Sequence, residues 1–329
     1  MFTRNPYLFV GTAAVALTLG ACGGGGGVAS MPAPAAAPTP APPATAASIT
    51  IFTNPSAGQY ASVGASVAGP GGNLDTYTSA SDRFGAVSSA DQDQPQIRYN
   101  AGGYYEIEMP GAAWDRLIPY KGDVNPDPAT NNYFQPQSVA QNYGYLVTSN
   151  TRNSGYSYSE LAGWGSAAAG RWGWVAFGTP TVDGGVPVSG SATYSGVAEG
   201  SADIMTADGL YGGYDTAHLT GSVTLNFDFA KGTLGGSMAL SLGDGMQPLD
   251  LGTFNFSQTV FSAGSTTYSG KFDTTAAGDN FFLGRFTGPH AEETIGAWAL
   301  PFVFDKGGDF LKADNQTHQA FGAWIAKRP

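Results

Sequence analysis

The sequence has little of what metal and redox chemistry need. Among 329 residues there is one cysteine, Cys22, and there are three histidines, His218, His290 and His318. A lone cysteine excludes an internal disulfide framework and a cysteine-rich zinc site. No histidine lies in a G-x-S-x-G, H-E-x-x-H or phosphate-loop pattern. We therefore expect no enzyme, no cofactor, no catalytic residue and no metal ligand, and a solvated loop position for the histidines.

Charge is also scarce, at 12% of residues, and it is mostly negative. The 14 Lys and Arg against 25 Asp and Glu give a net charge of −11. Nucleic-acid binding needs a basic surface, so we expect no nucleic-acid partner. The 48 glycines are about twice the usual share, and aromatic residues are frequent. This composition favours short strands and tight turns over helices, because glycine weakens a helix interior by roughly 1 kcal/mol.

Residues 1–21 have the pattern of a lipoprotein signal peptide. A short basic start, Met1–Arg4, precedes an apolar stretch, Leu8–Leu19, that is shorter than the ~20 residues needed to span a bilayer. It continues into Leu19-Gly20-Ala21-Cys22, which resembles a bacterial lipobox. We expect cleavage before Cys22 and acylation of its thiol. With more than one acyl chain on Cys22, insertion into membrane lipid is stable.

Residues 22–47 are expected to form a tether. Gly23–Gly27 give a flexible start, and the Pro/Ala-rich stretch Met31–Ala47 favours extended polyproline II. The residue after Cys22 is glycine and not aspartate, the enteric signal for retention in the inner membrane. The expected location is therefore the outer membrane of a Gram-negative bacterium, with the body lipid-anchored and surface-exposed.

Residues 48–184 predict an irregular β-rich domain. Short patterned pieces, such as 49–52 and 103–109, are separated by turn-rich stretches such as Asp123–Gln137. The segment Arg171–Phe177 has the pattern of a strand. Long polar connections between short strands predict many loops in this domain.

Residues 185–329 show clear strand periodicity. In Ser222–Phe229 apolar and polar residues alternate, which predicts one buried and one solvated face. Lys231-Gly232 marks a hairpin turn. Eight strands are expected around residues 191–196, 222–229, 234–242, 254–256, 268–272, 282–286, 298–304 and 321–326. The expected fold is all-β, with a C-terminal eight-stranded antiparallel barrel after the irregular β-rich domain.

Three segments resemble the barrel domain of transferrin-binding protein B. Pro187–Gly196 resembles its opening strand, and Gly284–Glu293 resembles its "G-x-F-x-G-P-x-A-x-E" signature. Phe321–Arg328 is similar to its closing "F-G-A-K-R" strand with a two-residue insertion. Factor H-binding protein and heparin-binding antigen are in the same group. The resemblance implies that the irregular β-rich domain, residues 48–184, is a handle-like domain that precedes the barrel. The residues that carry the resemblance are Gly190, Tyr194, Gly196, Gly284, Phe286, Gly288, Pro289, Ala291, Glu292 and Gly296.

We interpret this motif as structural. Gly284 and Gly288 would let strands bend at a barrel corner, and Pro289 would end a strand. Residues 290–293 would form a short turn in which Glu292 or Glu293 hydrogen-bonds backbone amides and closes the barrel end.

The resemblance implies a surface receptor or solute-binding module in the acquisition of iron or another nutrient, for an unknown protein or small-molecule ligand. A neighbouring TonB-dependent transporter would favour that role and would then be a partner. One alternative is a structural or host-interaction lipoprotein without a small-molecule ligand. Another is a haem or metal carrier that uses the barrel mouth. We expect specificity to lie in loops such as Asp123–Asn132 and Asp244–Gln247.

Overall fold

The computed structural model describes residues 51–52, 55–69, 83–120, 132–138, 144–149, 154–206, 215–243, 248–307 and 313–329. The signal peptide, Cys22 and the tether lie outside these residues, as do both predicted specificity loops apart from Asn132. Ala46–Pro329 form one compact unit. In the part of the chain that is described, no helix is long and apolar enough to cross a membrane.

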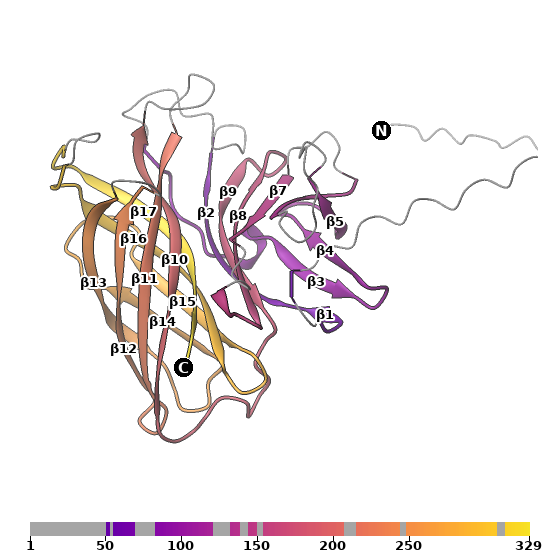
Figure 1. The fold of residues 1–329 in the computed structure, drawn as a ribbon. Helices are drawn as coiled ribbons and strands as arrows, with labels where there is room; N and C mark the ends of the chain where they lie inside the picture. The colour runs from indigo at the N-terminus through magenta and orange to yellow at the C-terminus, as the bar shows by residue number, and fades with distance from the viewer. Residues whose placement is uncertain are drawn as a thin grey trace, which may run out of the picture. The chain divides into compact units, whose positions relative to one another are not determined.

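The first half of this unit is a nine-stranded antiparallel sheet in the order β1-β3-β4-β5-β6-β7-β8-β9-β2 (Figure 1). Tyr60 alone separates β1 from β2, so one continuous segment pairs with β3 at its start and with β9 along its end, and the sheet nearly closes on itself. Its strands are β1 (Gly58–Gln59), β2 (Ala61–Ala68), β3 (Gln96–Asn100), β4 (Tyr104–Glu108), β5 (Asp115–Pro119), β6 (Tyr133–Pro136), β7 (Gly144–Thr148), β8 (Ser159–Ser166) and β9 (Arg171–Gly178).

The second half is a closed barrel of eight antiparallel strands, in which β17 pairs with β10 (Figure 1). The prediction of an all-β chain with an eight-stranded C-terminal barrel is confirmed. The strands are β10 (Ser191–Thr206), β11 (Asp215–Asp228), β12 (Thr233–Leu242), β13 (Leu249–Val260), β14 (Thr267–Phe272), β15 (Phe281–Thr287), β16 (Glu293–Val303) and β17 (Thr317–Lys327).

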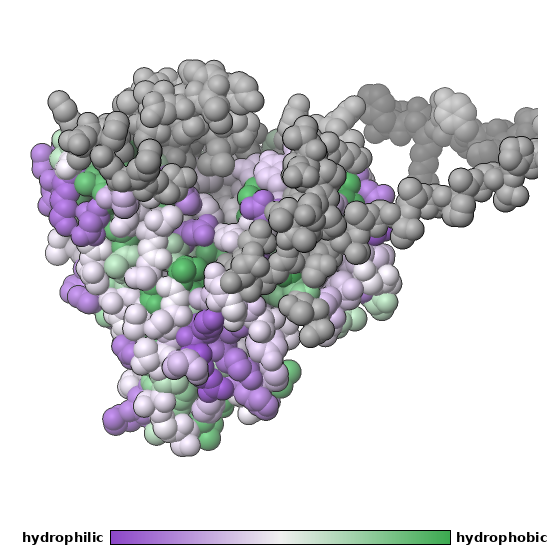
Figure 2. All heavy atoms as spheres, in the orientation of Figure 1, coloured by the Kyte–Doolittle hydropathy of each residue, from purple (hydrophilic) through white to green (hydrophobic). Residues whose placement is uncertain are grey.

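Side chains fill the interior of the barrel. Val223, Leu225 and Phe227 point inward from β11 with at most 1% exposure, as the alternating pattern predicted. The Phe227 ring lies 4.8 Å from Phe286 and 5.1 Å from Tyr268, centroid to centroid. The outward residues of strands β10–β14 include many serines, threonines and glycines, and pale spheres of intermediate hydropathy lie among purple and green ones on the face of the barrel seen in Figure 2.

Strands β16 and β17 are buried on both faces, because the sheet packs against the outside of the barrel there. Inward-facing Trp298 and Trp324 belong to the barrel core. The alternate residues Ile295, Phe321 and Ile325 belong to a second cluster with residues of the sheet. The members of this shared core on the sheet side include Ala61, Val63, Ala65, Val67, Leu161, Trp172 and Ala176.

Candidate functional site at the junction of sheet and barrel

The family-like motif forms the turn between β15 and β16 and contacts the sheet. Gly288 has φ = 82°, and a Cβ on it would lie 2.4 Å from the Glu292 carboxylate, so the turn needs glycine. Its N–H donates to Thr179 O at 2.9 Å, and its carbonyl accepts from Thr181 Oγ1 at 2.7 Å. Pro289 follows the end of β15 in the same turn. The motif therefore lies against the segment that links the sheet to the barrel.

Both glutamates of the motif accept hydrogen bonds from backbone N–H groups, but these groups lie in different parts of the structure. Glu292 Oε2 accepts His290 N–H at 2.8 Å and so orders the turn itself. Glu293 accepts Ser157 N–H at 2.7 Å and Tyr158 N–H at 3.1 Å, which fastens the barrel to the segment before β8. Burial raises the pKa of Glu293, and the hydrogen bonds from the two amides oppose the rise. Glu293 thus joins the barrel to the sheet.

Several other motif residues contact aromatic rings of the barrel or are themselves aromatic. Gly284 lies in regular pairing within β15, opposite Tyr268 and Gly296. A Cβ on Gly284 would lie 2.2 Å from Tyr268 Cζ, and this close approach is the reason for glycine. Tyr194 donates its hydroxyl to Ala291 O at 2.5 Å, and Phe286 lies inside the barrel. Gly190 precedes β10 and Gly196 lies within it.

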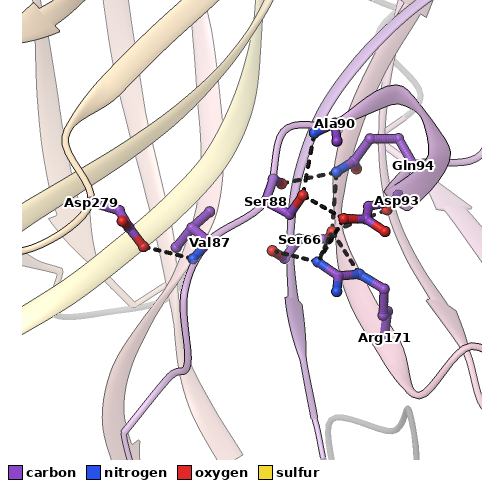
Figure 3. A network of polar contacts seen from close by, with 8 residues as sticks. All are labelled: Ser66, Val87, Ser88, Ala90, Asp93, Gln94, Arg171 and Asp279. Carbon is purple, nitrogen blue, oxygen red and sulfur yellow. Dashed lines mark hydrogen bonds and ion pairs between the residues drawn. The ribbon is translucent and has the colours of Figure 1, made fainter.

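A segment that we call the strap, residues 83–95, connects the edge of the sheet to the barrel (Figure 3). Ser88 and Ser66 on β2 exchange two backbone hydrogen bonds, of 2.8 and 2.9 Å. Val87 N–H donates to Asp279 Oδ2 at 2.7 Å, in the loop between β14 and β15. Asp93 lies 3.6 Å from Arg171 in an ion pair. Val87 and Asp279 are 192 positions apart in the chain, so no local sequence pattern indicates their contact.

A groove lies between the strap and strands β13–β15. Two adjoining cavities of about 400 and 340 Å³ share Ser89, Ser269 and Leu283 in their lining. Two cations line the groove, Arg285 and Lys271, and the one acidic lining residue of these two cavities is Asp91. The rest of the lining combines apolar residues with hydroxyl groups from Ser62, Ser89, Ser262, Ser265, Thr267 and Ser269.

The barrel wall is irregular beside this groove. The pairing of β13 with β14 shifts register between Ser257 and Val260. Between them Gln258, which lines the groove, has φ = 47°, a value uncommon for a residue other than glycine. Bulges of this kind occur often beside binding sites, because they redirect side chains and end strand pairing. Local irregularity and the groove therefore coincide.

His318 is buried, so the expectation of a solvated loop histidine is wrong for this residue. Its Nδ1 lies 3.0 Å from Asp203 and its Nε2 3.0 Å from Asp314. Burial by itself lowers the pKa of His318, but the hydrogen bonds to the two carboxylates outweigh it and the pKa is raised. Both ring nitrogens are occupied, and in the described residues no group of three or more potential ligand side chains is arranged for a metal ion.

The remaining histidines differ from each other. His218 stacks on Trp174, with ring centroids 5.4 Å apart, where the barrel meets β9. The neighbouring Glu199 accepts a hydrogen bond from the Ser149 hydroxyl at 2.9 Å. Burial raises the pKa of Glu199. His290 is exposed in the motif turn. His218 and Glu199 thus belong to the packing of the junction.

Residues 186–328 match the family described as the C-lobe and N-lobe β-barrels of transferrin-binding protein B. No curated protein matches the sequence. Among solved structures, a double mutant of transferrin-binding protein B from Haemophilus parasuis Hp5 is 12% identical, with a TM-score of 0.36 over 81% of this chain and 44% of that one. A mutant of the same protein from Actinobacillus pleuropneumoniae H49 is 15% identical, with a TM-score of 0.36 over 83% of this chain and 100% of that one.

A third solved relative, isotype 1 of transferrin-binding protein B from serogroup B Neisseria meningitidis, is 13% identical, with a TM-score of 0.37 over 82% of this chain and 43% of that one. The chain thus spans less than half the length of the Haemophilus and Neisseria proteins. The fold defines a closed antiparallel barrel joined to a second β-sheet. Residues 186–328 are thus similar to the barrels of transferrin-binding protein B, which confirms the resemblance seen in the sequence.

Proposed function

We propose that this chain is an outer-membrane lipoprotein that is displayed at the cell surface and binds a ligand there, in the acquisition of iron or another nutrient. The observation that carries the proposal is the barrel at 186–328, which matches a family named for transferrin binding. The shared core and the Glu293 hydrogen bonds give that barrel a fixed position on the sheet, as a binding scaffold requires. Cys22 and the tether of residues 22–47 supply the anchor and the spacer.

Binding fits the buried polar groups better than catalysis does. A catalytic acid, base or nucleophile must reach a substrate. In the described residues, Glu293 is occupied by two amides, His318 by two carboxylates and Glu199 by a serine hydroxyl.

The anchor is tested by Cys22→Ser. We expect this variant to lose acylation and to leave the membrane fraction, because a hydroxyl cannot replace the thiol in lipid transfer. Labelling with an alkyne-modified fatty acid, followed by membrane fractionation, measures both effects. A variant that is still labelled and still sediments with the outer membrane would exclude Cys22 as the anchor.

The acquisition role is tested by growth. A strain that lacks the chain should grow more slowly than its parent when iron-loaded transferrin or another defined source is the only iron supply, and it should grow equally well on free ferric citrate. Restoring the wild-type chain should restore growth, and the Cys22→Ser form should not. Equal growth of both strains under limitation of iron and of other nutrients would instead favour a structural or host-interaction role.

A further inference from the structure

The groove between the strap and the barrel has the composition of a small-molecule site. Its two adjoining cavities, of about 400 and 340 Å³, fall within the size of ligand pockets in proteins. The strap that forms one wall is held at defined points, by Val87 on Asp279 and by Ser88 on Ser66. The site is therefore formed before any ligand arrives, which lowers the entropic cost of binding.

The groove contains two positively charged side chains in a chain that is acidic overall. The net charge is −11, yet Arg285 and Lys271 are exposed and neither has an ion-pair partner among the described residues. Four of the other described cations, Arg83, Arg98, Arg171 and Lys231, are each paired with a carboxylate. Arg116 and Lys327 lie over aromatic rings, and Arg328 donates to His290 O. Lys306, outside the groove, likewise has no ion pair among the described residues. With Asp91 counted, the lining carries a net charge of +1. The groove thus favours an anion where most of the molecule repels one.

The strand register sets the distance between these cations. Thr267, Ser269 and Lys271 alternate with the inward-facing Tyr268 and Phe272, so they share the outer face of β14. Arg285 on β15 lies opposite Thr267. Lys271 is four residues further along β14, which is about 13 Å. The two charges therefore lie at opposite ends of an elongated floor.

Between the cations the floor offers hydroxyl groups and an apolar surface. Ser269 lies opposite Leu283 in the middle of the floor, and Phe281 lines the end near Lys271. Hydroxyl groups both donate and accept hydrogen bonds, so they suit a ligand that is itself rich in hydroxyl groups. The pairing of β14 with β15 occupies the backbone groups at positions 267–270, so an added peptide strand has little to bind there.

From this arrangement we infer that the groove binds a short acidic saccharide, with its acid groups directed to Arg285 and Lys271 and its hydroxyl groups to the serine and threonine lining. This deepens the proposed binding function and rests on it. The strap contributes Ser89 and Asp91 to one wall, and the barrel contributes the floor and both cations.

The inference is tested by calorimetric titration of the purified full-length chain with trigalacturonic acid at low salt, where charge attraction is weakly screened. Arg285→Gln and Lys271→Gln should each weaken binding roughly tenfold, since a charge-assisted hydrogen bond is lost. The control is Lys306→Gln, which removes the same charge from an exposed position outside the groove lining and should leave the affinity unchanged.

Two further ligands define the class. The methyl ester of trigalacturonic acid keeps the hydroxyl groups without the charge and should bind much more weakly. Capped tri-aspartate carries equal charge on a peptide and should also bind more weakly. No detectable binding of the acid, equal affinity in the Arg285 and Lys271 variants, or tighter binding of tri-aspartate would each overturn the inference. The growth test is independent of this titration, so failure of the acquisition role and failure of the groove assignment are distinguishable.

Discussion

At the scale of single residues, two strand glycines differ in whether their surroundings leave room for a side chain. Gly284 lies under the Tyr268 ring, whose Cζ would be 2.2 Å from an added Cβ. Gly235 on β12 has no heavy atom within 4 Å of that position. The residues are similar in sequence context and differ only in what covers them. The sequence alone therefore does not show which strand glycine is packed under an aromatic ring, because that contact depends on the tertiary structure.

Gly284→Ala should lower the free energy of unfolding by about 1–3 kcal/mol, because the Tyr268 ring must move within a filled core. Gly235→Ala should change it by no more than about 0.5 kcal/mol and can raise it, since alanine restricts the unfolded chain. Urea denaturation followed by circular dichroism measures both. Equal effects of the two substitutions would show that the ring contact at Gly284 does not matter.

At the scale of elements, local periodicity predicted those strands whose two faces differ. The alternation of Val223, Leu225 and Phe227 gave the correct inward face of β11. In β16 every residue from Glu293 to Phe302 is buried, so no alternation marks which side faces the barrel. The nine-stranded sheet was predicted only as irregular, because strands such as β6 have four residues and too few positions to show a period.

Contacts between distant elements were beyond local prediction. Asp203 lies 115 residues from His318, and Asp279 lies 192 residues from Val87. Local sequence patterns do not predict such pairs. His318 was therefore expected to be solvated, and the groove was not predicted. The turn that contains Glu292 and Glu293 was predicted because its sequence resembles a known motif, and its role toward the sheet was not.

The His318 network gives a pH dependence with a definite sign. The imidazolium ties β10, through Asp203, to the segment before β17, through Asp314. Because the folded-state pKa is raised, the charged histidine stabilises the fold fully below the unfolded pKa of about 6.5, and this stabilisation is lost as the pH rises through the folded-state pKa. Wild type should therefore exceed His318→Gln in unfolding free energy by more at acidic than at alkaline pH.

The control for this prediction is His290→Gln, at an exposed turn position. Its difference from wild type should be nearly independent of pH. Thermal melts at about pH 6 and about pH 9 provide the comparison, on either side of the usual histidine range. A His318→Gln difference that grows with pH would contradict the assignment of a protonated histidine between two carboxylates.

At the scale of the whole molecule, the shared core determines whether sheet and barrel behave as one unit. Residues 185–329 have strands that all pair with one another, so this fragment should fold alone as a β-only domain. In the fragment, however, Ile295, Phe321 and Ile325 on the outside of β16 and β17 lose the cover of β2, β8 and β9. An exposed apolar patch of this kind lowers solubility and binds hydrophobic dyes.

Ile295→Ala distinguishes coupled from independent folding. In the soluble body, residues 48–329, Ile295 is fully buried, so its truncation should reduce the free energy of unfolding by about 2–5 kcal/mol. In fragment 185–329 the same side chain faces solvent, and the loss should fall to about 0.5 kcal/mol. The body should also unfold in one calorimetric transition, at a higher temperature than the fragment, because the sheet and the barrel share this core. Two separate transitions in the body, the later one matching the fragment, together with equal losses for Ile295→Ala in both, would show that the barrel folds independently of the sheet.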